Sequence, residues 1–219
     1  MDPEVLRSYL PLYKEAFILT LETGWMGIAI AFAIGIVAAF ILHFRVPVLA
    51  KITSVYVELF RNTPLLVQLF FIYFALPKIG LSIPAETCGA LGLGLLGGSY
   101  MAEGIRSGLD AIGISQEESA LALGMSKRQM FMYVIFPEAL SISIPGIVAN
   151  VIFLLKDTSV FSAISLMDLM FTAKDLIGLY YDTTEALVLL VVFYIIMLLP
   201  VSVIGSIVEK KARYRTLGV

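Results

Sequence analysis

The sequence has little of the chemistry that soluble enzymes and metal sites use. It holds one cysteine, Cys88, and one histidine, His43, among 219 residues. A single cysteine excludes an internal disulfide, and no cluster of residues has metal-ligand spacing. The sequence contains neither a phosphate-binding loop G-x-x-x-x-G-K-[ST] nor a recognisable catalytic triad. We therefore expect no catalytic residue and no metal here, and any ATP hydrolysis belongs to another chain.

Charge is scarce as well, and apolar residues take its place. Charged residues make up 15% of the chain and hydrophobic residues 59%, against about 25% and about 45–50% in soluble domains. The mean hydropathy is +0.94. The apolar residues form runs near the roughly 20 residues that cross a bilayer. We expect one membrane domain over residues 1–219, and the net charge of −2 indicates no nucleic-acid partner.

Prolines and charges divide the chain into about five expected transmembrane helices, so the expected fold class is all-α integral membrane. In chain order the expected spans are Tyr13–Phe44, Ile52–Leu76, Pro84–Leu109, Gln129–Leu155 and Glu185–Val208. Residues Asp157–Asp182 carry more charge than the spans do. Short interfacial or re-entrant helices are expected there rather than a sixth span.

Lysine and arginine are unevenly distributed over the ends of these spans. The ends that are richer in them hold Arg45, Lys51, Arg106, Lys127, Arg128, Lys210, Lys211, Arg213 and Arg215. Because basic residues accumulate on the cytoplasmic side, these ends are expected inside the cell. The N-terminus is then outside and the C-terminus cytoplasmic.

Glycines are frequent in the third expected span. Residues 92–97 match the dinucleotide-binding string G-x-G-x-x-G, but no strand precedes them, so the string lacks its context. Gly94 with Gly98, and Gly104 with Gly108, have the spacing that lets membrane helices approach closely. Close helix packing is the expected role of these glycines.

A polar segment, residues 115–124, separates the third and fourth spans on the expected cytoplasmic side. Ser115 is a candidate N-cap, and Glu117 and Glu118 provide the acidic first turn that a helix dipole favours. Ala120, Leu121 and Leu123 would form one apolar face. Gly124 is placed to end the helix in a left-handed turn. A docking helix and an ordinary surface helix both fit these residues.

Four motifs carry a resemblance to a known family. Glu118-Ser119-Ala120, followed by Gly124 and Pro137, resembles the EAA motif of ABC importer permeases, with Ser119 replacing the middle alanine. Residues 58–68 resemble E-x-x-R-G-T-P-L-L-V-Q, with asparagine at 62 replacing glycine. Residues 99–108 resemble A-Y-x-A-E-x-x-R-x-G, and residues 156–159 are similar to K-D-T-S. The last three motifs resemble the polar amino-acid branch of these permeases, the histidine, glutamine and arginine permease-like family.

The resemblance implies a type I importer permease, a membrane-spanning subunit of an ATP-driven importer for polar amino acids. It implies a second permease copy or a paralogous permease, two copies of an ATPase subunit that bind ATP and Mg²⁺, and an extracytoplasmic solute-binding protein. The chain itself would hold no cofactor and would lie among lipids of a prokaryotic inner or cytoplasmic membrane. The coupling role falls on Glu118, Ser119, Ala120 and Gly124 of a coupling helix.

Charged and polar residues at membrane depth are candidates for the substrate pathway, because such residues are costly and usually pair or line a cavity. The candidates are Glu58, Arg61, Glu103, Arg106, Asn150, Lys156, Asp157, Thr158 and Ser159. Spacing of three residues predicts that Glu58 pairs with Arg61, and Glu103 with Arg106. A structural role, holding helices in register, and substrate contact both remain open for these pairs. Each pair would be close to neutral, and relatives often have a polar residue after the asparagine where this chain has Val151. A neutral or zwitterionic amino acid is therefore expected.

Three alternatives remain at this point. A standalone secondary transporter or channel would be expected to show internal inverted repeats or an intramembrane ion site, and the sequence shows neither. An intramembrane enzyme would need paired catalytic groups within the spans. Within the importers, a permease for methionine, an opine or an organic cation would share the coupling motif.

Overall fold

The computed structural model describes the backbone of residues 3–217 and the side chains up to Ala212. Residues 1, 2, 218 and 219 of the expected domain, and the side chains of Arg213 and Arg215, lie outside the described residues. All regular structure in the described part of the chain is helical, which confirms the expected all-α class.

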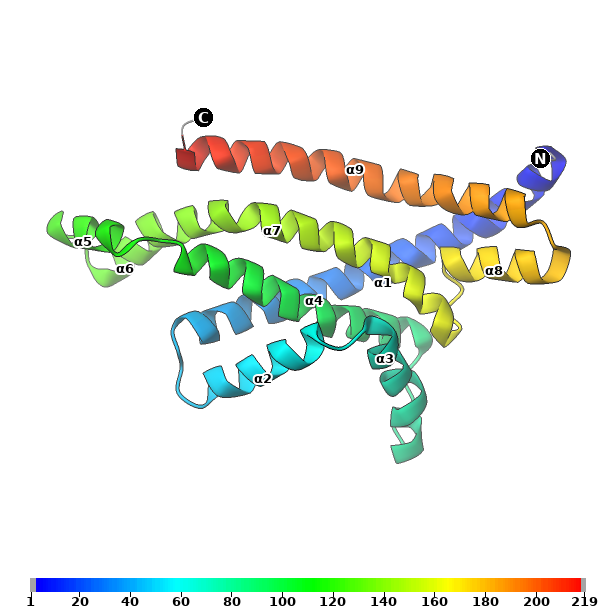
Figure 1. Cartoon of the computed structure of the whole chain (residues 1–219), viewed down its shortest axis with the longest axis horizontal. Helices are drawn as coiled ribbons and strands as arrows, with labels where there is room; N and C mark the ends of the chain where they lie inside the picture. Colours follow the sequence, from blue (N-terminus) through cyan, green and yellow to red (C-terminus); the bar gives the residue numbers. More distant parts are fainter. Residues whose placement is uncertain (1–2, 218–219) are drawn as a thin grey trace.

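Four long helices run side by side along the molecule (Figure 1). They are α1 (Pro3–His43), α4 (Ala85–Asp110), α7 (Phe136–Asp157) and α9 (Thr183–Leu217). The shorter elements are α2 (Leu49–Arg61), α3 (Leu65–Phe70), η1 (Phe71–Ala75), η2 (Leu76–Ile79), α5 (Ile114–Ala122), α6 (Lys127–Met130), η3 (Phe131–Ile135), η4 (Thr158–Ile164) and α8 (Leu169–Tyr180). Helix α4 is central, because it packs against α1, α2, α3 and α7.

Glycines of α4 make this central position possible. A Cβ atom at Gly97 would lie 2.6 Å from Leu154 Cδ1 of α7 and 2.8 Å from Ala31 Cβ of α1. Cβ atoms at Gly94 and Gly98 would be equally close to side chains of α1 and α2. The close packing that the glycine spacing predicts is therefore confirmed at these positions. The glycines let three neighbours reach the backbone of α4.

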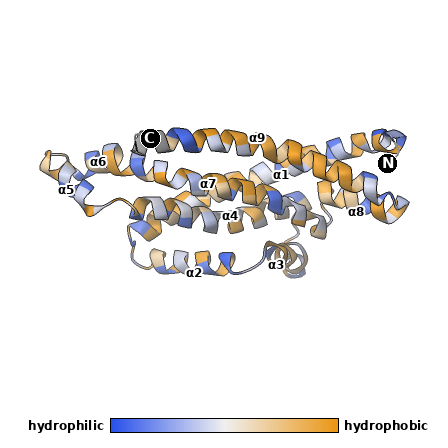
Figure 2. Ribbon diagram, turned by 45° about the horizontal axis from the view of Figure 1, so that its top comes forward, coloured by the Kyte–Doolittle hydropathy of each residue, from blue (hydrophilic) through white to orange (hydrophobic). Residues whose placement is uncertain are grey.

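Among the described residues, three helical stretches are long and apolar enough to span a membrane: Pro3–His43, Lys127–Ile164 and Thr183–Ala212. Figure 2 shows the hydrophobic middle of α9 and its hydrophilic C-terminal part. Helix α4, at the place of the third expected span, is not among these stretches, so the described residues hold three or four candidate spans instead of the expected five. It has 26 residues and is about 39 Å long at 1.5 Å per residue. It is less apolar than the other three, which fits its enclosure by protein instead of lipid.

The second expected span, Ile52–Leu76, is not a single straight helix. Helix α2 and the segment Leu65–Ile79 meet at an angle of 104°, and they qualify as a fourth span only if taken together as one broken span. Pro64 explains the break, because proline has no N–H to donate and disfavours the helical conformation at the residue before it. The expectation of short helices after Asp157 is confirmed by η4 and the 12-residue α8.

Candidate functional site

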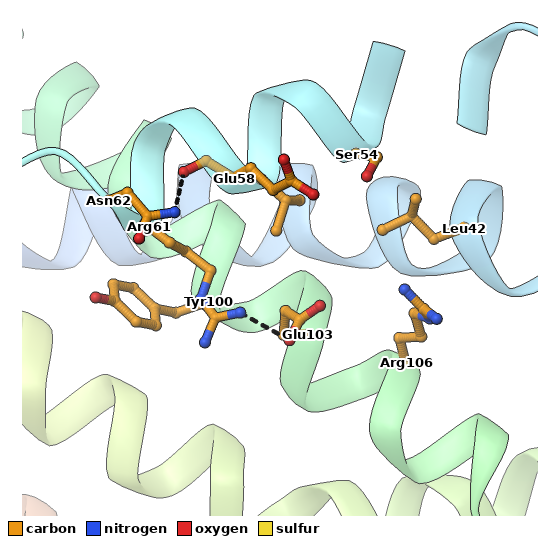
Figure 3. Close-up of a pocket in the computed structure, with 9 residues that line it drawn as sticks. Leu42, Ser54, Glu58, Arg61, Asn62, Tyr100, Glu103 and Arg106 are labelled. Carbon is orange, nitrogen blue, oxygen red and sulfur yellow. Dashed lines mark hydrogen bonds and ion pairs between the residues drawn. The ribbon is translucent and has the colours of Figure 1, made fainter. Parts of the chain in front are cut away.

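A polar hollow of about 410 Å³ lies between α2 and α4, close to the end of α1 (Figure 3). Its lining residues are Leu42, Ser54, Val57, Glu58, Arg61, Asn62, Tyr100, Glu103 and Arg106. The four charged candidates of the second and third expected spans therefore share one hollow. Polar groups that converge on a concave site of this size are typical of a ligand site or pathway.

The ion pairs in this hollow join different partners from those that spacing predicts. Arg61 Nη1 donates to Glu103 Oε2 at 2.7 Å, and the Arg61 guanidinium lies 5.3 Å from the centre of the Tyr100 ring. The predicted pairs within one helix, Glu58–Arg61 and Glu103–Arg106, are wrong. Arg61 stands in the last turn of α2 and reaches across to α4, where Glu103 offers a shorter contact (Figure 3).

Arg106 takes part in a second network at the ends of α1 and α4. Its Nε donates to Asp110 Oδ2 at 3.0 Å, and Asp110 Oδ1 lies 2.7 Å from His43 Nδ1. Sequence reasoning missed Asp110, because the third expected span ends one residue before it, and it gave His43 no ion-pair partner. The four-residue spacing of Arg106 and Asp110 is the signal that could have found this pair.

Glu58 is exposed on the hollow, and no hydrogen bond or ion pair joins its carboxylate to another described residue. Its backbone carbonyl accepts from Asn62 Nδ2 at 2.7 Å, which ties only the main chain. The expectation of a neutral substrate rests partly on Val151 and partly on Glu58 being neutralised by Arg61. Because Arg61 pairs with Glu103 instead, the second ground is wrong and only the first remains.

A second hollow, of about 560 Å³, surrounds the break between α2 and α3. It shares Arg61, Asn62 and Tyr100 with the first hollow, and Asp157 at the end of α7 also lines it. Lys156 instead lines a groove between α7 and α9. The structure therefore brings Asp157 to the other charged candidates and places Lys156 elsewhere.

The remaining candidates of the fourth span face neighbouring helices. Thr158 is buried, and its Oγ1 donates to the Leu155 carbonyl at 2.7 Å. Ser159 is half-buried, and its carbonyl accepts from Ser162 Oγ at 3.1 Å. Asn150 is half-buried, and its Nδ2 would lie 3.6 Å from a Cβ atom at Gly104 of α4. Thr158 is best explained by packing, and Asn150 by its position between α7 and α4.

The polar segment that follows α4 forms the short helix α5, which lies at one end of the molecule (Figure 1). Its N-cap is Gly113, so the prediction that Ser115 caps the helix is wrong. Ser115 already lies inside the helix, and its carbonyl accepts from Ser119 Oγ at 2.7 Å. The helix starts earlier because Gly113 is extended and Ile114 is already helical.

The end of α5 is a left-handed turn, as the sequence predicts. Gly124 has a φ of +77°. Its N–H donates to the Leu121 carbonyl at 2.9 Å, and the Met125 N–H donates to the Ala120 carbonyl at 3.2 Å. These two bonds form a Schellman motif, which satisfies carbonyls at the helix end.

The apolar side chains of α5 do not share one face. Ala120 is buried in a small cluster with Met130 and Ile135, whereas Leu121 and Leu123 are 47% and 83% exposed. Glu118 and Ser119 are exposed as well. Helix α5 is thus held to the protein through Ala120 and presents two leucines outward.

A hydrogen bond links α5 to the long helix α7. Gln116 Nε2 donates to Glu138 Oε1 at 2.9 Å. The Glu138 carboxylate, which lies in the fourth expected span, therefore has a partner on α5. The bond connects the first turn of α5 with the first turn of α7.

Replacing Glu138 with alanine is expected to lower the amount of substrate moved per ATP several-fold. The change removes the acceptor for Gln116, and a net hydrogen bond is worth about 0.5–1.5 kcal/mol. Glu138→Gln keeps an acceptor oxygen at the same place and serves as the matched control. Simultaneous assays of uptake and phosphate release would check this, and equal ratios for both variants would contradict the role of the bond.

Comparison with known proteins identifies the family of this chain. The chain matches the family described as the binding-protein-dependent transport system inner membrane component over residues 16–214. It is 35% identical over 172 residues to the probable glutamine ABC transporter permease protein GlnP of Bacillus subtilis (strain 168), covering 78% of this chain and 79% of that protein. It is 30% identical over 205 residues to the arginine transport system permease protein ArtQ of the same organism, covering 93% and 94%.

Two solved transporter structures have the same fold as this chain. A chain of the crystal structure of an amino acid ABC transporter with histidines superposes with a TM-score of 0.89 at 31% identity, covering 96% of this chain and 99% of that chain. The MetNI methionine ABC transporter superposes with a TM-score of 0.78 at 20% identity, covering 97% and 99%. The second likeness shows the fold alone.

The family match spans most of the chain. It excludes two of the alternatives, a standalone secondary transporter and an intramembrane enzyme. The similarity to amino-acid permeases favours a polar amino acid as the substrate over an opine or an organic cation. The chain therefore belongs to the inner membrane components of binding-protein-dependent transport systems, as the multi-pass permease subunit of an ABC importer for polar amino acids whose ATPase is a separate subunit.

Proposed function

We propose that this chain lines one half of the translocation path and carries movement from the ATPase to that path through α5. The observation that carries the proposal is an unbroken series of contacts. Gln116 of α5 bonds Glu138 of α7, α7 packs against α4, and α4 carries Glu103 and Arg106 in the charged hollow. A displacement of α5 would therefore reach the hollow through two helix contacts.

The proposal includes the partners of the chain, which the family match supports. Glu118, Ser119, Ala120 and Gly124 form or terminate the helix that docks on an ATPase subunit, which is present in two copies and binds ATP and Mg²⁺. The exposed leucines of α5 supply its apolar contact. A second permease copy or a paralogous permease completes the path, and a solute-binding protein delivers the amino acid at the opposite end. Residues 1–219 act as one membrane domain without a cofactor of their own.

The orientation that supports this assembly has the N-terminus outside and the C-terminus in the cytoplasm. Figure 1 shows α5, α6 and the C-terminal end of α9 toward one end of the molecule, with the N-terminus and α8 at the other. Lys127, Arg128, Lys210 and Lys211 lie in α6 and the C-terminal part of α9. Basic residues at that end fit a cytoplasmic side.

Site-specific photo-crosslinking in the assembled transporter tests the proposal. A photoreactive residue at Leu123, which is 83% exposed on α5, is expected to crosslink to the ATPase subunit. The matched control is Leu179 on α8, which is 62% exposed and lies at the other end of the molecule. Crosslinks to the ATPase from Leu179, or none from Leu123, would contradict the docking role of α5.

Glu118→Lys is expected to impair transport more than Glu117→Lys. Both changes remove a favourable charge from the start of α5, which is worth about 0.3–1 kcal/mol. Glu118 is exposed whereas Glu117 is half-buried, so Glu118 offers more of its side chain to the ATPase. Uptake by the two variants, compared at equal amounts of assembled transporter, would check this. Equal losses would reduce the role of Glu118 to stabilising the helix.

The charge of the transported amino acid can be decided by competition. A neutral or zwitterionic amino acid remains our prediction, so excess glutamine should inhibit labelled uptake more strongly than arginine does. Glu58 is the residue that argues against it, because its carboxylate is exposed on the hollow. Strong and selective inhibition by arginine, lost in Glu58→Gln, would contradict a neutral substrate.

A further inference from the structure

Arg61 lies between two hollows. The hollow between α2 and α4, here the inner hollow, measures about 410 Å³, and the hollow around the helix break, the outer hollow, measures about 560 Å³. Both are lined by Arg61 and Tyr100. Glu103 and Arg106 line only the inner one, and Asp157 lines only the outer one. The two spaces therefore meet at the Arg61 side chain.

The Arg61 guanidinium is held in place from two directions. Glu103 accepts its hydrogen bond at 2.7 Å, and the Tyr100 ring centre lies 5.3 Å from its central carbon. Both contacts come from α4, while Arg61 ends α2 just before the bend of 104°. The pair thus ties the broken helix to the central helix (Figure 3).

The pair is only partly enclosed by the chain. The side chains of Arg61 and Glu103 are 38% and 42% exposed, so neither is buried in the helix packing. Both side chains line the inner hollow, and Arg61 also lines the outer one.

We propose that Arg61 and Glu103, with Tyr100 against the guanidinium, form an ion-pair gate between the outer and the inner hollow. The inference rests on the proposed function, because it takes the hollows to be parts of the translocation path. The closed gate is the arrangement in this structure. Passage of an amino acid requires the pair to separate.

Separation is feasible because each charge has an alternative partner nearby. Unpaired charges at membrane depth are costly, so a working gate needs such partners. Asp157 offers Arg61 a carboxylate in the outer hollow. Arg106 offers Glu103 a cation in the inner one if it leaves Asp110, which keeps its contact with His43. No hydrogen bond or ion pair joins the Asp157 side chain to another described residue. Exchange of partners would open the gate without leaving either charge unpaired.

Thiol labelling across the gate tests the proposal. Cys88 is fully buried and is replaced by serine, and Ser54, which lines the inner hollow, is replaced by cysteine as the reporter. The assembled transporter is reconstituted in proteoliposomes and treated with a membrane-impermeant sulfonated methanethiosulfonate from the N-terminal side. We expect slow labelling with the gate intact and several-fold faster labelling in Arg61→Gln and in Glu103→Gln.

Charge exchange distinguishes a gate from a purely structural contact. The double variant R61E/E103R restores an ion pair of reversed polarity and is expected to bring labelling back toward the slow rate. Lys51→Gln removes one positive charge from the same helix without touching either hollow and should leave the rate unchanged. If Arg61→Gln fails to assemble, Glu103→Gln asks the same question from α4.

Labelling that is equally fast in the reporter background and in Glu103→Gln would overturn the gate. So would rapid labelling that persists in R61E/E103R when that variant assembles. Uptake measured in the same vesicles distinguishes a failure of the gate from a failure of the proposed function. Uptake without the ATPase subunit would contradict the proposed function whatever the labelling shows, whereas normal ATP-driven uptake with unchanged labelling would contradict the gate alone.

Discussion

Replacing Gly124 with valine is expected to abolish most transport while the permease still inserts in the membrane. Gly124 has a φ of +77°, which valine adopts only at a cost of about 1–2 kcal/mol. A Cβ atom there would meet nothing within 4 Å, so the strain is conformational and not a clash. Loss of the Schellman turn would change the direction and the end of α5. Simultaneous assays of ATP hydrolysis and uptake should show hydrolysis continuing as uptake falls.

Gly80 provides a matched control for this prediction. Its φ is +87°, and a Cβ atom there would also meet nothing within 4 Å. It follows η2, far along the chain from α5, so Gly80→Val introduces the same kind of strain away from α5. Uncoupling of the same size in both variants would show that backbone strain alone, and not the end of α5, is responsible.

Replacing Gly97 with valine is expected to prevent stable assembly. The Cβ atom would come within 2.6 Å of Leu154 on α7 and 2.8 Å of Ala31 on α1. Overpacking of a core typically costs about 1–3 kcal/mol, and here two helices must shift at once. We expect lower yield of assembled transporter and a lower melting temperature in detergent.

Gly178 of α8 is the control for packing. Nothing lies within 4 Å of a Cβ atom at Gly178, and that glycine is exposed. Gly178→Val should therefore assemble normally. Equal melting temperatures for the Gly97 and Gly178 variants would contradict the view that glycines of α4 set the helix packing.

Hydrophobic runs predict the long helices well, because an uninterrupted apolar segment of this length has few other stable structures in a membrane. They fail at the second span, where apolar residues continue on both sides of the break at Pro64. Hydropathy alone indicates one helix there, and the direction of the segment after the break depends on how it packs against α4. Pro77, which we expected to stop the span, lies within η2 instead.

The sequence predicts which charged residues form the site, but not which of them pair with one another. Glu58, Arg61, Glu103 and Arg106 meet in one hollow, as candidate pathway residues should. Spacing along one helix shows which charges share a face, but not which charge a neighbouring helix presents. The rotation of α2 against α4 decides that Arg61 reaches Glu103.

The family motif and elementary backbone physics each predict part of α5. Gly124 follows from both, because the motif marks it and its left-handed conformation needs glycine. The outward position of Leu121 and Leu123 does not follow from the sequence, which groups them with Ala120. Only the cluster around Met130 and Ile135 determines which of these side chains is buried.

ATP-driven uptake of a labelled polar amino acid into proteoliposomes tests the central claim most directly. The vesicles hold this permease with its ATPase subunit, and the solute-binding protein is supplied at the N-terminal side. We predict uptake only when ATP is present at the side of α5, and near loss of uptake in Gly124→Val. Uptake that proceeds without ATP or without the ATPase subunit would contradict the account.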